Sequence, residues 1–184
     1  LEAAPGAARR GGRARGRDVI DADAVRHEID LDAPPEVVWR YLTETALLSQ
    51  WIGISAELDP VVGGAFRFEI VPGEWCEGRY VELDPPRHLI VTWGWTTPSF
   101  RLPPGTSRVT FELTANGAGT RLALVHDHLP GELRAIHDDG WTRFLPALAQ
   151  AVECAPRVER GGSDQPWGVS EICPGCRVAD RPAR

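Results

Sequence analysis

The amino-acid sequence predicts an α+β fold in which a curved antiparallel sheet wraps around a long C-terminal helix. Three observations support this prediction. Short runs of alternating apolar and polar residues follow one another with tight turns between them. A pair of short helical segments comes after the first of these runs, and an apolar stripe with helical spacing ends the pattern.

The first strand and the two short helices are expected within residues 25–51. Apolar and charged side chains alternate over residues 25–31, as in a half-buried strand. Pro34 and Pro35 then break the strand. A proline in the first helical turn loses no hydrogen bond, because its missing N–H would have no partner there. Apolar residues follow at helical spacing, and a second short helix is expected to run to Trp51.

Six further strand-like runs follow the two helices. They cover residues 54–58, 65–70, 78–83, 88–96, 108–114 and 120–128. Turn signals separate them, among which Asn116-Gly117 is a strong hairpin signal. Consecutive strands joined by tight turns predict an antiparallel meander, which has one face in water and one face against the core.

A long helix is expected to end the folded part of the chain. Pro130-Gly131 opens it, and its apolar stripe consists of Trp141, Phe144, Leu145, Leu148 and Val152. Pro146 lies inside this stripe and is expected to kink the helix or to shift its boundary. Because no other large apolar element remains, the helix should cover the dry face of the sheet, and the curvature of the sheet leaves space between the two.

The chain of 184 residues is long enough for one hydrophobic core. We expect one domain over residues 24–155. Residues 1–23 form an Arg-rich segment and residues 156–184 are rich in Pro and Gly, and neither shows an apolar period. Both flanking segments are therefore expected to be disordered tails.

Charge and composition exclude several classes of function. The net charge is −6, and because both flanking segments are basic, the acidic excess falls on the central domain, which does not suit a nucleic-acid partner. No run of about 18 apolar residues exists, so no membrane span is expected. No apolar signal-peptide core follows the Arg-rich start, which favours a cytoplasmic protein. The sequence contains no Lys, so Schiff-base chemistry and the phosphate-loop motif are excluded.

Several segments resemble the SRPBCC (START-like) superfamily, and most closely its bacterial AHSA-like subgroup, the relatives of the activators of heat-shock-protein ATPases. These segments include residues 34–39 (PPEVVW), 62–68 (VGGAFRF), 78–89 (GRYVELDPPRHL) and Gly140-Trp141. The resemblance extends over residues 25–152 and implies a helix-grip (START-like) fold with a hydrophobic cavity between the sheet and the C-terminal helix. The loop at residues 98–105 and Pro146 depart from the family pattern.

Strand parity, helical spacing and the resemblance together select the residues expected to line the cavity and to contact a ligand. They are Trp51, Phe66, Phe68, Val91, Trp93, Trp95, Phe111, Leu124, His126, Trp141, Phe144 and Leu148. Buried aromatic residues usually form packed core, and this remains the alternative interpretation, because a cavity wall is built from the same inward positions.

Two pairs of residues could hold a metal, and no metal is expected at either. His126 and His128 lie two apart on a strand, which predicts that both face the same side as Leu124, but a third ligand is not apparent. Cys173 and Cys176 have zinc-knuckle spacing, yet their segment supplies two of the four ligands of a structural zinc site. The four cysteines are not expected to form a disulfide framework.

No catalytic set is apparent in the sequence, and no cofactor is expected. A role of His126 as a general acid or base would need a titratable partner. The nearest candidates are Tyr80, Glu112 and Asp127, of which Asp127 points away from His126 by strand parity. The motifs of serine hydrolases, P-loop proteins and dinucleotide-binding proteins are absent from the sequence.

Three functions follow from these observations. The favoured hypothesis is a non-enzymatic protein that binds a small apolar molecule in the cavity. The resemblance supplies the second, a co-chaperone-like protein-binding module that stimulates a heat-shock-protein ATPase in a bacterial stress response. The third is a cyclase or hydrolase that acts inside the cavity.

Overall fold

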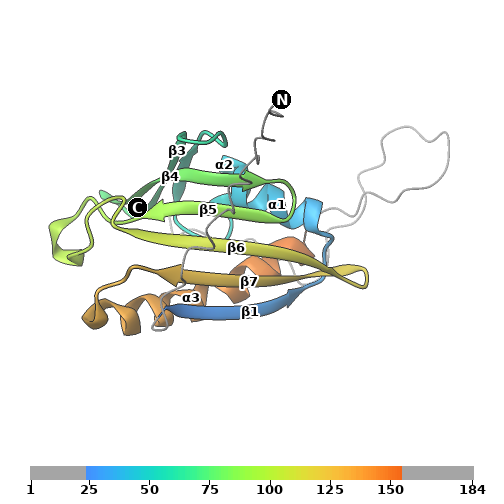
Figure 1. The fold of residues 1–184 in the computed structure, drawn as a ribbon. Coiled ribbons are helices and arrows are strands. Elements are labelled where there is room, and N and C mark those ends of the chain that lie inside the picture. The colour runs from blue at the N-terminus through green and yellow to red at the C-terminus, as the bar shows by residue number, and fades with distance from the viewer. Residues whose placement is uncertain (1–23, 155–184) are drawn as a thin grey trace, which may run out of the picture.

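The computed structural model describes residues 24–154, which form one curved sheet and a set of helices on one of its faces (Figure 1). In chain order the elements are β1 (Val25–Leu31), α1 (Pro35–Thr43), α2 (Thr45–Leu48), β2 (Ser55–Leu58), β3 (Ala65–Val71), β4 (Glu74–Asp84), β5 (His88–Trp93), the 3₁₀ helix η1 (Pro98–Phe100), β6 (Ser107–Asn116), β7 (Gly119–Asp127) and α3 (Gly131–Glu153). The two expected tails, and with them Cys173 and Cys176, lie outside the described residues.

The sheet is a seven-stranded antiparallel meander in which the first strand forms one edge, next to the last strand. Its strand order is β1-β7-β6-β5-β4-β3-β2. The excursion through α1 and α2 lets β1 pair with the last strand, with Ile29 opposite Leu122. The predicted α+β helix-grip architecture is confirmed, including two short helices after the first strand and six strands before the long helix.

The longest strand, β4, pairs with β3 on one side and β5 on the other, and both pairings contain a register shift. Its register against β5 shifts between Tyr80 and Glu82, as at a β-bulge. Gly78 lies just before this shift, and a Cβ atom there would come within 1.7 Å of the Thr92 carbonyl oxygen. Only glycine permits this close approach of two backbones, which allows the sheet to bend.

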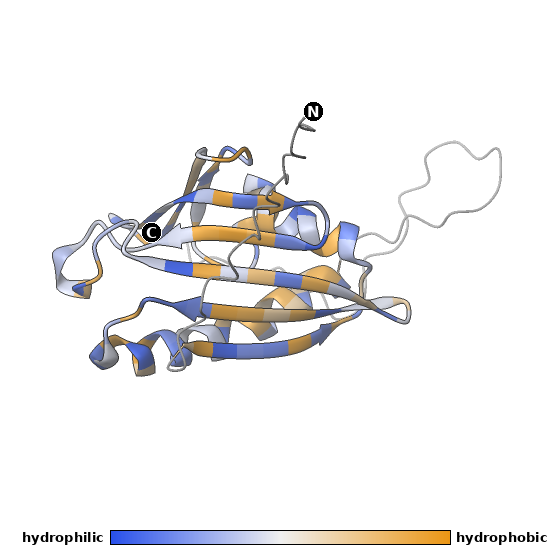
Figure 2. Ribbon diagram, in the orientation of Figure 1, coloured by the Kyte–Doolittle hydropathy of each residue, from blue (hydrophilic) through white to orange (hydrophobic). Residues whose placement is uncertain are grey.

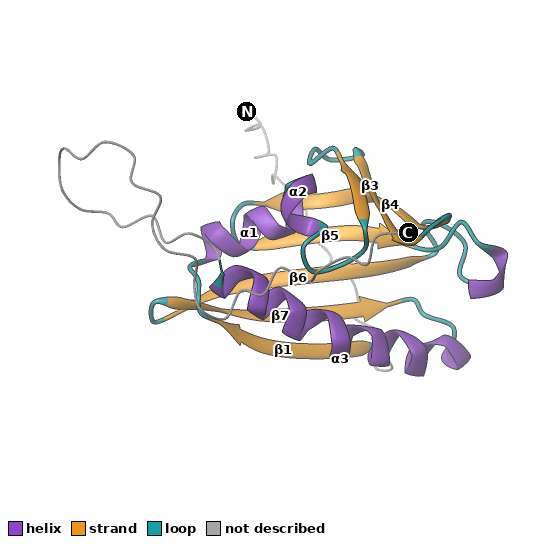
Figure 3. Cartoon of the chain, turned by 180° about the vertical axis from the view of Figure 1, so that it is seen from behind, coloured by secondary structure: helices purple, strands orange, loops and turns teal. Residues whose placement is uncertain are grey.

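The helices lie on the inner face of the sheet, where the core forms (Figure 3). Apolar residues recur along β5, β6 and β7, largely in alternation with polar ones on β6 and β7, and they recur along α3 behind these strands (Figure 2). From α3 the buried residues are Trp141, Leu145, Leu148 and Val152, as the helical spacing predicts. Val38, Tyr41 and Leu42 of α1 extend the same core toward the other end of the sheet.

Pro146 does not end the long helix, contrary to the expectation of a shifted boundary. The helix continues to Glu153, and Pro146 lies on its exposed side. Proline removes one backbone N–H donor and crowds the preceding turn. The apolar residues on either side of it, Leu145 and Leu148, are both buried against the sheet. Tertiary packing therefore holds the helix together through a residue that would break an isolated one.

Leu148 provides a test of this packing. It is fully buried where α3 meets the sheet, so Leu148→Ala is expected to lower the free energy of unfolding by about 2–5 kcal/mol. Gln150 is exposed on the same helix, and Gln150→Ala is expected to change it by less than about 0.5 kcal/mol. Urea denaturation of both variants measures the difference. Equal losses would show that α3 does not depend on this buried stripe.

Candidate functional site

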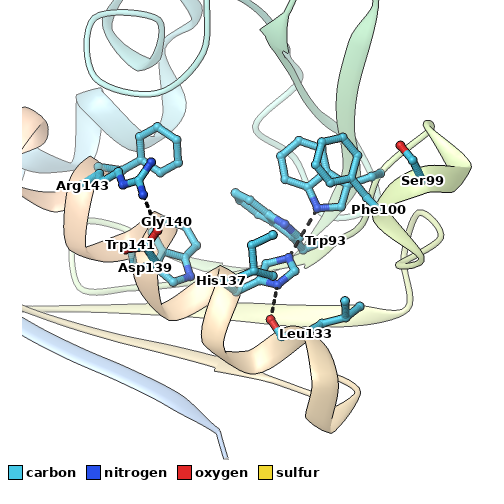
Figure 4. Close-up of a pocket in the computed structure, with 12 residues that line it drawn as sticks. Trp93, Ser99, Phe100, Leu133, His137, Asp139, Gly140, Trp141 and Arg143 are labelled. Atoms are coloured by element: carbon cyan, nitrogen blue, oxygen red, sulfur yellow. Dashed lines mark hydrogen bonds and ion pairs between the residues drawn. The ribbon is translucent and has the colours of Figure 1, made fainter.

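A pocket of about 350 Å³ opens between the first half of α3, the end of β5 and the loop that follows β5 (Figure 4). It is lined by Trp93, Trp95, Ser99, Phe100, Leu133, Ile136, His137, Asp139, Gly140, Trp141, Arg143 and Phe144. Its volume lies within the range of small-molecule sites. Most of the lining residues are apolar or aromatic, so the interior suits an apolar ligand.

Aromatic rings from the strand, the loop and the helix form the walls of the pocket. The ring centroids of Trp93 and Trp141 are 5.1 Å apart, and those of Trp93 and Trp95 are 6.1 Å apart at nearly right angles. Phe100 stacks on Trp95 with centroids 4.6 Å apart. These are favourable geometries for aromatic pairs, and they fix the orientation of the walls.

The loop after β5 brings Phe100 onto Trp95. Arg101 follows η1 in the left-handed backbone conformation, with φ of 55°, which turns the chain back toward the sheet. Leu102 is then buried, and its carbonyl oxygen accepts a hydrogen bond of 2.7 Å from the backbone N–H of Trp95. The Pro-rich segment that departs from the family pattern in the sequence thus forms one wall of the pocket.

His126 lies behind the pocket, fully buried, and holds the helix to the sheet. Its Nδ1 accepts a hydrogen bond of 3.1 Å from Trp141 Nε1, which can only donate. The proton of the neutral ring is therefore on Nε2, which donates to Ser107 Oγ at 2.9 Å. Ser107 Oγ in turn donates to the Trp93 carbonyl oxygen at 3.1 Å. This chain fixes the tautomer and connects α3, β7, β6 and β5.

Burial keeps His126 neutral. Desolvation is the main cause that lowers the pKa of His126 to about 3, and the neighbouring His137 lowers it further. Both ring nitrogens already have partners inside the protein. His126 is thus arranged as a structural connection, and neither nitrogen is free to exchange a proton with a ligand.

His137 is the ring that faces the pocket (Figure 4). Its Nδ1 donates to the Leu133 carbonyl oxygen at 2.8 Å, so Nε2 carries the lone pair when the ring is neutral. Nε2 accepts from Trp95 Nε1 at 3.4 Å, which is long for a hydrogen bond. Partial burial lowers the pKa of His137, which favours this neutral form. An acceptor nitrogen is therefore available at the wall of the pocket.

The charged groups of the pocket lie at its rim and neutralise each other. Asp139 and Arg143 form an ion pair one helical turn apart, and both side chains are mostly exposed. Exposed pairs of this kind contribute little to stability. The pocket therefore has a polar rim around an apolar interior.

Four of the predicted ligand contacts line the pocket, namely Trp93, Trp95, Trp141 and Phe144. The other eight lie in the core behind it and are buried: Trp51, Phe66, Phe68, Val91, Phe111, Leu124, His126 and Leu148. The structure thus brings together the aromatic residues at one end of the sheet. The contacts of these residues with a ligand stay a prediction.

Sequence reasoning missed the loop residue Phe100 and the helix residues Leu133 and His137, all of which line the pocket. The spacing of Leu133, His137, Trp141 and Phe144 continues the apolar stripe of α3 toward its start, and this signal was present in the sequence. Phe100 lies in an irregular loop, where no helical or strand periodicity predicts the orientation of its side chain.

His128 does not share the side of His126, contrary to strand parity, and the alternative of one inward, hydrogen-bonded histidine and one histidine at the strand end describes the pair. β7 ends at Asp127, and His128 has φ of 60° and an exposed side chain that bonds to Asp127 at 2.7 Å. The change of backbone conformation at the strand end breaks the alternation of sides. Within residues 24–154 there is no group of three side chains that could hold a metal ion.

The three titratable partners suggested for His126 lie elsewhere. Tyr80 Oη donates to the Leu42 carbonyl oxygen, Glu112 is on the outer face of β6, and Asp127 pairs with Arg108 at 3.0 Å. The observed partners of His126 are Ser107 and Trp141, which the sequence did not indicate.

The two cysteines within residues 24–154 differ in their covalent state. Cys76 is buried and free, and desolvation raises its pKa. Cys154, which follows the last residue of α3, is disulfide-bonded, whereas the sequence did not predict a disulfide there. The expectation that no metal binds to Cys173 and Cys176 concerns residues outside the described part of the chain and stays a prediction.

The helices of the described segment include none that is both long and apolar enough to cross a membrane.

Comparison with known proteins identifies a family for most of the described segment. The sequence model of the family described as Activator of Hsp90 ATPase homolog 1-like protein matches residues 32–153. This range includes every residue of the pocket. A search of curated proteins finds no significant match.

Solved structures with the same fold come from several bacteria. A protein from Mesorhizobium loti is 26% identical, with a TM-score of 0.65, and the match covers 73% of this chain and 99% of that one. The AHSA1 protein from Silicibacter pomeroyi is 27% identical, with a TM-score of 0.60 and coverage of 71% and 97%. The Aha1 dimer from Colwellia psychrerythraea shares the fold at 22% identity, with a TM-score of 0.61 and coverage of 71% and 96%.

The buried neutral histidines predict a loss of stability in mild acid. Because the pKa of His126 is lowered from 6.5 to about 3 on folding, the unfolded chain binds more protons between these values. The free energy of unfolding should therefore fall by about 1.4 kcal/mol per pH unit below pH 6.5, and His137, whose pKa is also lowered, adds to the loss. Urea denaturation at pH 7.5, 6.0 and 5.0 measures this slope.

Two variants show which group causes the dependence of the free energy of unfolding on pH. His126→Gln removes the titrating ring and should flatten the dependence on pH, leaving the contribution of His137. Ser107→Ala removes a hydrogen-bond partner without removing a titrating group, so it should lower stability at every pH and keep the slope. A slope that is unchanged in His126→Gln would contradict the buried neutral state.

Proposed function

Since the chain belongs to the Activator of Hsp90 ATPase homolog 1-like family, we propose that it binds a small apolar molecule in the pocket between α3, the end of β5 and the η1 loop. The single observation that carries this proposal is the pocket itself. Five aromatic rings, those of Trp93, Trp95, Phe100, Trp141 and Phe144, surround about 350 Å³ of space. An apolar ligand there would be transferred from water to aromatic surfaces.

The rigidity of the walls supports binding. Trp141 is held by its hydrogen bond to His126, and Trp95 is held by the stacking of Phe100. A pocket whose side chains are already ordered loses little conformational entropy when a ligand enters. The walls are therefore preorganised for a flat molecule.

The arrangement of His126 favours binding over catalysis. A general base needs a nitrogen within hydrogen-bond reach of the ligand. In His126 one nitrogen accepts from Trp141 and the other donates to Ser107. The cyclase or hydrolase hypothesis therefore loses the residue on which it was based.

Gly140 offers a test of the pocket with a matched pair of variants. It lies on α3 at the pocket, and a Cβ atom there would have as its nearest neighbour the Phe144 ring at 3.8 Å. Gly140→Ala should stabilise the helix by about 0.5–1 kcal/mol and keep the pocket open. Gly140→Leu should fill the pocket without unfolding the protein and prevent binding of naphthalene.

Two-dimensional NMR of the tryptophan indole N–H groups follows this binding residue by residue. On addition of naphthalene, the signals of Trp95 and Trp141 should shift in the wild type and in Gly140→Ala. The signal of Trp51, which lies in the core outside the pocket, serves as internal control. Binding that persists in Gly140→Leu, or shifts confined to Trp51, would place the ligand elsewhere.

A second candidate function is the co-chaperone role that the family description carries. Three exposed valines favour it: Val61 and Val62 in the turn after β2, and Val81 on β4. The backbone hydrogen bond from Gly63 N to the Tyr80 carbonyl oxygen, 2.7 Å long, brings this turn alongside β4. An exposed apolar group of this kind is a feature of protein-binding surfaces.

The co-chaperone candidate predicts that the protein raises the ATP hydrolysis rate of a purified heat-shock-protein ATPase of the Hsp90 class. Val62→Asp should then reduce the stimulation at least several-fold, because it places a charge in an apolar contact. Gln50→Asp, a change at another exposed position, is the matched control. An ATPase rate that does not respond to the wild-type protein would exclude this function.

A further inference from the structure

Trp95 and His137 supply a donor–acceptor pair at the wall of the pocket. Trp95 Nε1 is a donor and His137 Nε2 is an acceptor, and both side chains line the pocket. The two nitrogen atoms are 3.4 Å apart, which exceeds the usual 2.7–3.2 Å range for a hydrogen bond. Their mutual bond is therefore weak and can be given up to a ligand.

From this pair we infer that the ligand is a neutral aromatic molecule with a hydroxyl group, which accepts a hydrogen bond from Trp95 Nε1 and donates one to His137 Nε2. This inference rests on the proposed function and specifies its ligand class. Two atoms that are 3.4 Å apart can both lie within normal hydrogen-bond distance of a single oxygen atom placed beside them. A hydroxyl oxygen has both the proton and the lone pairs that this position requires.

The direction of the two bonds is fixed by the surroundings of His137. Its Nδ1–H is held by the Leu133 carbonyl oxygen at 2.8 Å, so the lone pair of the neutral ring must be on Nε2. Desolvation is the main cause that lowers the pKa of His137. The ring is therefore neutral and can accept a hydrogen bond at Nε2. The indole of Trp95 can only donate.

Other polar groups satisfy this pair less well. An ether accepts from Trp95 but leaves His137 Nε2 without a donor. A carboxylate would place negative charge against the lone pair of Nε2, and the Arg143 side chain that could attract it is already paired with Asp139 at the rim. An ammonium group would leave the Trp95 N–H without an acceptor. A buried polar group without a partner is costly, so the site discriminates among these groups.

The aromatic walls of the pocket are the reason to expect an aromatic ligand. The donor–acceptor pair includes Trp95, whose ring stacks on Phe100, and Trp141 lines the same pocket one helical turn after His137. Flat rings suit such walls because they bury a large area in stacked or edge-on contact. A hydroxylated aromatic molecule therefore matches both the rings and the polar pair.

The test compares three probes of similar size: 2-naphthol, 2-methoxynaphthalene and naphthalene. Dissociation constants are measured by isothermal titration calorimetry on the full chain. We expect 2-naphthol to bind about tenfold more tightly than 2-methoxynaphthalene, since one additional hydrogen bond is worth about that factor. His137→Phe keeps a ring at the wall and removes the acceptor, so the preference should fall to about one.

Controls separate this inference from the proposed function. His88→Phe, on β5 outside the pocket, should keep the preference of the wild type. If His137→Phe does not fold, Trp95→Phe removes the donor of the pair, so it should abolish any advantage of 2-methoxynaphthalene over naphthalene and keep the preference for 2-naphthol. Equal binding of the three probes would overturn the hydroxyl inference while leaving the apolar pocket. Failure of all three to bind would overturn the proposed function itself.

Discussion

One buried hydrogen bond, which Trp141 Nε1 donates to His126 Nδ1, joins the long helix to the polar centre of the sheet. An imidazole without partners would be costly at this depth, so both its nitrogens must be satisfied within the protein. Trp141 satisfies one from α3 and Ser107 satisfies the other from β6. Because Ser107 continues to the Trp93 carbonyl oxygen, one polar chain connects the helix to three neighbouring strands. The rings of Trp141 and Trp93 are placed by this chain, and they are also two walls of the pocket.

The division between solid core and pocket follows from where the large side chains of α3 fall. In the second half of the helix Leu145, Leu148 and Val152 are buried against the sheet and leave no space. In the first half, Gly140 has no side chain to fill the gap beside Phe144. The Trp93 indole N–H also lacks a hydrogen-bond partner among residues 24–154, although the ring is buried amid other aromatic rings. The protein accepts this cost, of about 1–3 kcal/mol, at the aromatic end of its core.

Periodic features made most of the fold predictable. Strand alternation and the stripe on α3 placed Trp93, Trp95, Trp141 and Phe144 on the inner face, and these four residues line the pocket. The sequence could not distinguish pocket wall from packed core, because both use the same inward positions. It also misplaced His128, where a backbone conformation with φ of 60° ends the strand alternation. Pro146 was expected to kink the helix or to shift its boundary, but the helix continues to Glu153 because the local cost of the proline is smaller than the packing on either side of it.

The two histidines near the pocket show how one residue type takes two roles through its partners. His126 has hydrogen bonds of 2.9 Å and 3.1 Å at its two nitrogens, so it is closed to further contacts. His137 has one firm bond, to the Leu133 carbonyl oxygen, and one long contact with Trp95. The fully bonded ring serves the structure, whereas the incompletely bonded ring can recognise a ligand. Because the rings are 5.0 Å apart, a positive charge on one would disfavour a charge on the other. Burial is the main cause that lowers the pKa of both rings and so favours their neutral forms, which preserves the acceptor that faces the pocket.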